Sequence, residues 1–304
     1  MFSTYFELTI FLKSLSNPLT SPDNSPQSSV DVSVSTVFYR GAHSVPENLV
    51  FSSQDSVCFY VHLSAFSGAA ECAFRPILSA PLSDSRYQTT RIHVPETSEI
   101  LNIIFHVIYN MSCLKHSPSF NAIVTAIGRM PVYEISPKDY MAPSTPLHEL
   151  LLHSMSHHPL EVYAIAAHYD VYDIAEAASA HLLSYPLNSI SDEIVTQMGP
   201  VYLKRLLCLH ANRLNALKYM IMTPPTFHAP TESCTYEEQK KLSRTWVMAA
   251  AHLVWDAQPS LSTHNLEAAF RPLQDQLSCP ECCEIFSGRV REVAQGWSGV
   301  KDTI

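Results

Sequence analysis

Apolar and polar residues alternate in short runs through the early part of the chain, which is the pattern of strands with one buried face. Val30–Tyr39 is one such run, and Asn48–Phe51 and Val57–Val61 form a pair. The polar stretch Ser-Ser-Gln-Asp-Ser between that pair predicts a tight hairpin in which Asp55 bonds nearby backbone amides. Arg91–Glu96 alternates again and predicts a further short strand.

After Glu96 the apolar residues recur at helical spacing, and Thr97 is expected to cap the first helix. From Thr145 onward the pattern predicts only helices, with an interruption at Gly199–Pro200 and another near Asn212. Later apolar positions expected in the core are Leu242, Trp246, Ala249, Leu253, Trp255, Phe286, Val290, Val293 and Trp297. Early strands followed by helices indicate an α+β fold class with an all-helical C-terminal region.

Changes in composition suggest three parts. Residues 14–30 are rich in Ser, Pro and Asn, so we expect residues 1–45 to form an N-terminal segment that is partly disordered. The strands and first helices fall in residues 46–140, and residues 141–304 are expected to form a helical C-terminal domain.

Three segments in this order carry a resemblance to a known family: "SSQDSVCFYVH", "IHVPETSEILNIIFHVIYN" and "VYAIAAHYDVYDIAEAASAHLL". Together they resemble the BTB/POZ domain. Three further segments, "STPLHELLLH", "MGPVYLKRLLCLH" and "SCPECCEIFSGRVREVAQGWSGVKDTI", make the chain from about residue 46 more closely similar to BTB-domain proteins of mushroom-forming fungi. Phe66 departs from the leucine that many BTB helices carry there, and Ala70 from a frequent serine. The resemblance implies a small sheet flanked by helices.

The resemblance also implies roles for single residues. His62, at the exit of the hairpin, is expected to be structural and to lie at the start of a helix. Tyr169 is expected to pack, and Asp170 to cap the next helix. If the chain pairs with a second BTB domain, the resemblance favours an apolar helical face as the interface, formed by Leu63, Phe66 and Phe74.

The charge and hydropathy of the chain narrow the classes of partner. The net charge is -9 and no cluster of Lys and Arg is present, so a nucleic-acid partner is not expected. No run of eighteen apolar residues occurs, so no membrane span is expected. Partners are therefore expected to be proteins, in the cytoplasm, the nucleus or both.

The eight cysteines are scattered except near the C-terminus, which favours reduced thiols over a disulfide framework. Cys279-Pro-Glu-Cys282 could give two ligands to zinc, and a closed site needs two more. Either Cys208 and His210, or His228 and Cys234, could supply them. The first pair gives the zinc hypothesis of four residues Cys279, Cys282, Cys208 and His210. The simpler interpretation is packed thiols at a helix start with no cofactor.

No phosphate-binding loop or nucleophile motif is present, and no catalytic residue is predicted. The main hypothesis is a non-enzymatic interaction protein that forms homodimers or heterodimers. By the resemblance, it could act as a substrate adaptor for a cullin-type ubiquitin ligase. One alternative is a transcriptional or scaffold protein that self-assembles, and another is a zinc-stabilised module that uses the C-terminal cysteines.

Overall fold

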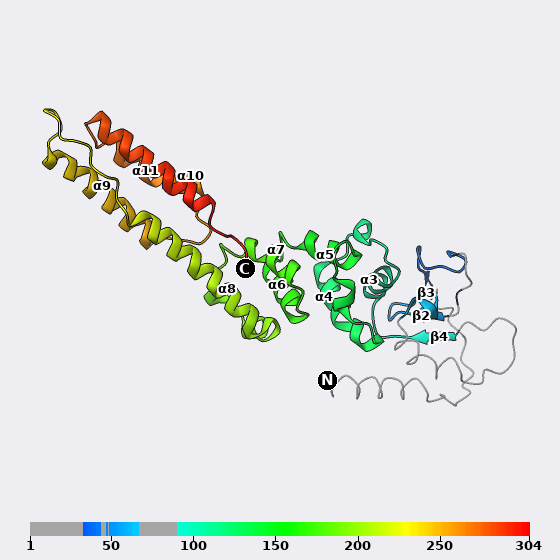
Figure 1. The fold of residues 1–304 in the computed structure, drawn as a ribbon. Helices are drawn as coiled ribbons and strands as arrows, with labels where there is room; N and C mark the ends of the chain where they lie inside the picture. The colour runs from blue at the N-terminus through cyan, green and yellow to red at the C-terminus, as the bar shows by residue number, and fades with distance from the viewer. Residues whose placement is uncertain (1–32, 44–46, 48, 67–89) are drawn as a thin grey trace, which may run out of the picture. The chain divides into compact units, whose positions relative to one another are not determined.

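The computed structural model describes residues 33–43, 47, 49–66 and 90–304, and these residues form two compact units (Figure 1). The division between the units falls between Ser154 and Met155. The domain boundary expected from the sequence lies earlier, between residues 140 and 141. Among the described residues, no helix has the length and apolar character needed to cross a membrane.

The first unit contains a four-stranded sheet in the order β1-β3-β2-β4. β2 (Leu49–Ser52) and β3 (Val57–Val61) form the expected antiparallel hairpin. β1 (Ser33–Val34) runs parallel to β3, and β4 (Thr90–His93) runs parallel to β2. β1 is much shorter, within the described residues, than the alternating run that predicted it.

Asp55 in the hairpin turn holds the start of the next helix, α3 (Ser98–Ile108). Its carboxylate accepts hydrogen bonds from the Ser98 backbone N–H at 2.8 Å and from the Ser98 hydroxyl at 2.6 Å. Thr97 occupies the N-cap position, as predicted, but its side chain makes no capping bond. Asp55 of the hairpin therefore supplies the capping bonds that the sequence had assigned to Thr97.

His62 lies between β3 and a short 3₁₀ helix, η1 (Leu63–Ala65), which agrees with its expected place at the start of a helix. The Tyr109 hydroxyl at the end of α3 lies 2.9 Å from Nδ1 of His62 and accepts a bond from its backbone N–H at 2.8 Å. His62 therefore joins the sheet to α3, which is a structural role.

The core of the first unit is built from aromatic rings that meet between the sheet and α3. The rings of Phe51 and Phe59 lie 5.3 and 5.4 Å from the ring of Phe105. Phe66 is buried, and its ring stacks on Phe51 at 6.0 Å. The expectation that Phe66 forms an interface is therefore wrong for the folded chain, because its ring fills the core. The Leu63 side chain and Phe74 lie outside the described residues.

The other elements described in the first unit are helices: α4 (Phe120–Arg129), α5 (Pro146–Ser154), and the 3₁₀ helices η2 (Leu114–His116), η3 (Met130–Tyr133) and η4 (Pro137–Tyr140). The carboxylate of Glu96 is buried beneath this layer. It accepts a bond from Nε of Arg129 at 2.6 Å and one from the Tyr133 hydroxyl at 2.5 Å. The buried carboxylate thus links α4 and η3 to the residues that follow β4, while the Arg129 side chain remains partly exposed.

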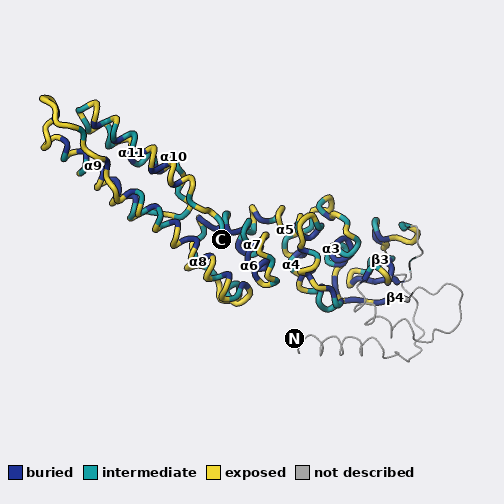
Figure 2. The backbone as a smooth tube through the Cα atoms, viewed as in Figure 1, coloured by how far each residue is buried: buried dark blue, intermediate teal, exposed yellow. Residues whose placement is uncertain are grey.

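The second unit consists of α6 (Pro159–His168), α7 (Tyr172–His181), η5 (Leu187–Ser189), α8 (Asp192–Ile221), α9 (Tyr236–Trp255), α10 (Thr263–Gln274) and α11 (Pro280–Ser298). α8 is broken at Gly199, as predicted, but it continues without interruption past Asn212. The alternation of buried and exposed positions along these helices can be followed in Figure 2.

The turn between α6 and α7 differs in part from its prediction. Tyr169 is half-buried and packs edge-on against His168, as a packing role requires. Asp170 has a left-handed backbone, with φ of 54°, and its carboxylate accepts a bond from the Tyr202 hydroxyl at 2.9 Å. The N-cap position of α7 is occupied by Val171 and not by Asp170. Asp170 instead connects this turn to α8.

The core of the second unit joins α9, α10 and α11. The ring of Trp246 stacks on Phe270 at 4.5 Å and meets Phe286 edge-on at 5.6 Å. The core residues predicted for α9 and α11 are buried except one, Trp255, whose exposed fraction is 89%. Trp255 is the last residue of α9, and the expectation that all tryptophans are core is wrong for this residue.

The chain end returns to the helices of this unit. The guanidinium of Arg213 in α8 donates to the carbonyls of Pro259, Val300 and Lys301 at 2.7 to 3.0 Å. It also lies 4.4 Å from the ring of Trp297. Arg213 thus connects α8 with the loop before α10 and with the residues after α11.

Candidate metal centre

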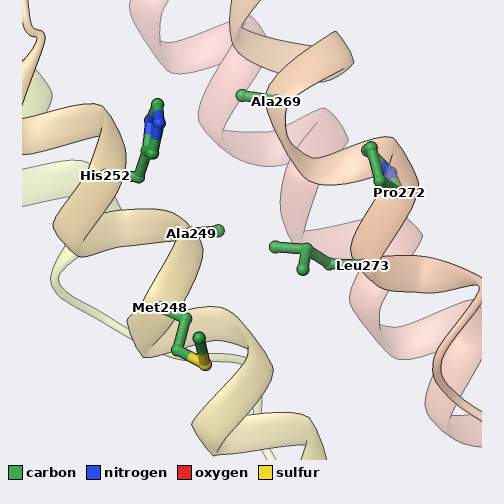
Figure 3. Close-up of a pocket in the computed structure, with 6 residues that line it drawn as sticks. All are labelled: Met248, Ala249, His252, Ala269, Pro272 and Leu273. Carbon is green, nitrogen blue, oxygen red and sulfur yellow. The ribbon is translucent and has the colours of Figure 1, made fainter.

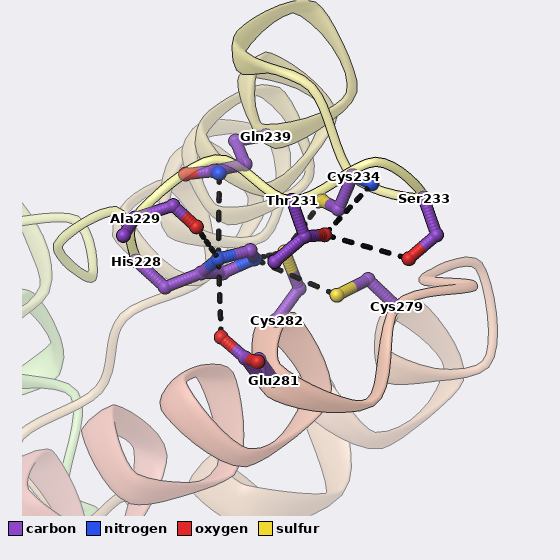
Figure 4. Close-up of polar contacts among 9 residues, drawn as sticks. All are labelled: His228, Ala229, Thr231, Ser233, Cys234, Gln239, Cys279, Glu281 and Cys282. Atoms are coloured by element: carbon purple, nitrogen blue, oxygen red, sulfur yellow. Dashed lines mark hydrogen bonds and ion pairs between the residues drawn. The ribbon is translucent and has the colours of Figure 1, made fainter.

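Four side chains with metal-binding atoms meet in the second unit (Figure 4). His228 and Cys234 lie in the loop between α8 and α9, and Cys279 and Cys282 lie at the start of α11. Their nitrogen and sulfur atoms all lie within 4.8 Å of one another. In the described part of the chain, no other group of three or more His, Cys, Asp and Glu residues meets in this way.

The loop that carries His228 and Cys234 is held by its own hydrogen bonds. The prolines of "TPPTFHAP" restrict its backbone. Thr231 and Cys234 exchange backbone hydrogen bonds at 3.0 and 3.2 Å, and the Thr231 hydroxyl accepts a further bond from the Cys234 N–H. This closed turn points the Cys234 thiol toward α11.

The start of α11 places the other two thiols one helical turn apart. Cys279 is the N-cap residue, and Pro280 occupies the first helical position, where its fixed φ suits a helix. The Cys283 N–H donates to the Cys279 carbonyl at 3.0 Å, which closes the first turn. Cys279 and Cys282 are therefore neighbours on one face of the helix start.

Three of the six distances among these atoms match those around a tetrahedral zinc ion, and the others are at most 4.8 Å. Bonds of about 2.3 Å to sulfur and about 2.0 Å to nitrogen would place two sulfurs about 3.8 Å apart and sulfur and nitrogen about 3.5 Å apart. The sulfurs of Cys234 and Cys282 are 3.8 Å apart. Nε2 of His228 lies 3.5 Å from the sulfur of Cys279 and 3.3 Å from that of Cys282.

The hydrogen bonds of His228 orient its ring for metal binding. Nδ1 donates to the Ala229 carbonyl at 2.7 Å, and the Glu281 carboxylate lies 3.2 Å from the same nitrogen. With the proton on Nδ1, the lone pair of Nε2 faces the sulfurs. The Ala229 carbonyl is the main reason that the pKa of His228 lies above its usual value, and Cys279 and Glu281 add to this effect.

The three thiols differ in how readily they ionise. The backbone N–H of Cys282 lowers the pKa of the Cys279 thiol to about 7. Burial raises the pKa of Cys282 to about 12, and burial also raises that of Cys234. Cys279 is thus the first of the three thiols to lose its proton as the pH rises. A bound dication would ionise the other two, because metal coordination deprotonates thiols.

A cavity of about 20 Å³ lies beside the three thiols and is also lined by Glu238 and Lys241. A single water-sized sphere needs about 10–15 Å³, so this space suits one small ion or water and excludes an organic ligand. A larger cavity, about 330 Å³, lies between α9 and α10 (Figure 3). Its lining is largely apolar and includes Met248, Ala269 and Leu273, with His252 at one side.

The sequence predicted two ligands of this centre, Cys279 and Cys282, and gave two alternative pairs for the other two ligands. The pair His228 and Cys234 completes the cluster. The zinc hypothesis that used Cys208 and His210 is wrong, because both residues lie on α8 outside the cluster. The Cys208 side chain is exposed, and Nε2 of His210 is buried without a hydrogen-bond partner among the described residues. The predicted set failed because the loop pair and the helix pair have no standard spacing in the sequence.

In comparisons with known proteins, no family model, curated protein or solved structure matches this chain. The BTB/POZ resemblance therefore rests on the sequence segments that carry it.

Proposed function

We propose that the second unit of this protein is a zinc-stabilised helical module, and that the whole chain acts as a non-enzymatic interaction protein. The observation that carries the zinc proposal is the convergence of one imidazole nitrogen and three thiol sulfurs within 4.8 Å. Sulfur and imidazole ligands favour zinc over magnesium or calcium, which prefer oxygen.

The arrangement favours a structural role for the metal over a catalytic one. Four protein ligands close the coordination sphere of zinc and leave no open position for a substrate. The ligands come from two segments that are distant in the sequence, the α8–α9 loop and the start of α11. A zinc ion would cross-link these segments, and the bonds from His228 to Ala229 and Glu281 would support the imidazole ligand.

The zinc proposal is tested by metal analysis of the reduced, full-length chain. We expect about one zinc per chain, bound with the free energy typical of structural sites, about 10–16 kcal/mol. Cys282→Ser should lose the zinc, because it removes a buried ligand. Cys283→Ser is the matched control, since the Cys283 thiol donates to the Leu277 carbonyl and is not in the cluster. A folded wild-type chain that stays metal-free in excess zinc would contradict the proposal.

The interaction proposal concerns the first unit and follows from the BTB/POZ resemblance. What supports it is the order of hairpin, short helix, strand and helices along the first unit. The first unit also lacks, among its described residues, any cluster of metal-binding side chains. The partners we propose are a second BTB-type domain and, for an adaptor, a cullin scaffold.

A binding experiment separates the adaptor from the scaffold hypothesis. The purified full-length chain is titrated against cullin scaffolds, and its mass in solution is measured by light scattering. Saturable binding to one cullin supports the adaptor. A folded, dimeric chain that binds none of them leaves self-assembly as the function, and a folded monomer that binds none contradicts both.

A further inference from the structure

The three thiols of the metal centre are not equally accessible to solvent. The exposed fraction of Cys234 is 1% and that of Cys282 is 3%, whereas Cys279 is only partly buried. Cys279 also lies at the rim of the small cavity, next to Ser278. A small oxidant from solvent therefore meets Cys279 first.

Cys279 has a partner thiol in position to form a disulfide. Residues three apart on a helix have Cα atoms about 5 Å apart, and the N-cap residue lies at the end of the helix and can adjust. A disulfide needs Cα atoms about 4.4–6.8 Å apart, which this spacing meets. The sulfurs of Cys279 and Cys282 already lie within 4.8 Å of each other.

Two other thiols lie close to this pair, and neither is as well placed to form the disulfide. Cys283 donates a hydrogen bond to the Leu277 carbonyl at 3.4 Å and is not among the four clustered residues. Cys234, although its sulfur lies 3.8 Å from that of Cys282, is buried and held by the Thr231 turn. Cys279 is therefore the thiol that an oxidant reaches first, and Cys282, one turn along the same helix start, is its partner.

We propose that the zinc centre is a reversible peroxide-sensitive switch, in which Cys279 and Cys282 form a disulfide and the zinc ion is released. This inference rests on the zinc centre proposed above. Once the disulfide forms, only His228 and Cys234 remain as ligands, and two ligands do not close a zinc site. The α8–α9 loop then loses its link to α11.

The oxidation balances with hydrogen peroxide as the oxidant. The Cys279 thiolate attacks one peroxide oxygen, the O–O bond breaks, and a sulfenic acid and hydroxide form. The Cys282 thiolate then attacks the Cys279 sulfur, the S–S bond forms, and the sulfenic oxygen leaves as a second hydroxide. Two thiolates have lost two electrons to peroxide, and two protons from solvent convert both hydroxides to water.

The test titrates the zinc-loaded full-length chain with hydrogen peroxide, while a colorimetric chelator reports free zinc and mass spectrometry assigns the disulfide. We expect one zinc released for each Cys279–Cys282 disulfide, and rebinding after dithiothreitol and zinc are added. Cys208→Ser and Cys283→Ser are the matched controls. Cys208 is exposed on α8 and can oxidise without touching the centre, so both variants should release zinc as the wild type does.

The outcomes separate this inference from the zinc proposal. A reduced chain that binds no zinc contradicts the zinc centre itself. A chain that binds zinc but keeps it while Cys208 oxidises contradicts only the switch. A disulfide that contains Cys234, or a release that requires Cys283, contradicts the assigned pair.

Discussion

Three histidines of this chain show how burial and bonding assign different roles to one residue type. His62 meets a tyrosine hydroxyl and joins a strand to a helix. His228 presents Nε2 to three thiols because its Nδ1 is bonded to a carbonyl. His106 is fully buried in α3, where Nδ1 lies 2.7 Å from the Asn102 carbonyl and Nε2 has no partner among the described residues.

We predict that His106 makes the first unit sensitive to acid. Burial is the main reason that the pKa of His106 lies below its usual value, and His116 and Lys115 lower it further. The unfolded chain therefore binds this proton at a higher pH than the folded chain does. Stability is complete above the unfolded pKa, about 6.5, and is lost as the pH falls from there toward the lower folded pKa.

The measurement is urea unfolding followed by circular dichroism at pH 7.5 and pH 5.5. The wild type should lose more stability between these values than His106→Phe, which keeps an aromatic ring against Phe38 and does not titrate. His153→Phe is the matched control, because it makes the same substitution at an imidazole that is exposed rather than buried. Equal losses in the wild type and His106→Phe would rule out this role.

At the level of single residues, the sequence predicted which side chains form bonds better than it predicted the residues that they bond to. Asp55 was expected to bond backbone amides nearby, and it bonds an amide that lies far along the chain, in Ser98. Cys279 and Cys282 were recognised by their spacing, but their completing ligands were recognised only as one of two pairs. Local spacing identifies residues that share a turn, whereas the other ligands depend on how α8, α9 and α11 pack, which no local pattern encodes.

Among the helices, the spacing of apolar residues was enough to predict a helix where many of its residues are buried on one side. The stripes of α9 and α11 were predicted and are buried. α10 was not predicted, because only Leu266 and Phe270 of its residues are buried and Pro272 lies inside it. Its start is nevertheless capped by Ser262, which accepts a bond from the Asn265 N–H at 3.1 Å. Helices with two buried residues and an internal proline give too weak a pattern to be recognised.

The break in α8 provides a test of backbone conformation with an internal control. Gly199 has φ of 72° and ψ of 168°, a conformation that is essentially restricted to glycine. An added Cβ would meet no atom within 4 Å, so the cost of Gly199→Ala is conformational alone. We expect this variant to lower the free energy of unfolding of the second unit by about 1–3 kcal/mol.

Gly288, in the middle of α11, should respond in the opposite direction. An added Cβ there also meets no atom within 4 Å, and the residue is helical, so Gly288→Ala should raise the free energy of unfolding by about 0.5–1 kcal/mol. Urea unfolding followed by tryptophan fluorescence measures both variants. Similar effects of the two substitutions would mean that the conformation of Gly199 is not required.

At the scale of the whole chain, each of the two units has buried groups of its own. The first unit contains the aromatic core and the Glu96–Arg129 pair, of which the carboxylate is buried. The second unit has its own buried cluster, to which Cys234 and Cys282 belong. The proposed zinc ion would therefore lie at the edge of the second core and would stabilise that unit alone.

This separation predicts that removing zinc destabilises one unit and spares the other. All three tryptophans, Trp246, Trp255 and Trp297, lie in the second unit, so tryptophan fluorescence of the full chain reports on that unit. In the presence of a zinc chelator, the thermal transition seen by tryptophan fluorescence should move to lower temperature, because zinc binds the folded unit and not the unfolded one. The transition seen by tyrosine near-ultraviolet dichroism should keep a component that does not move.

Cys282→Ser should show the lower transition without chelator and should not respond to it, whereas Cys283→Ser should behave as the wild type. A chelator that shifts both components equally would contradict the confinement of the metal to the second unit.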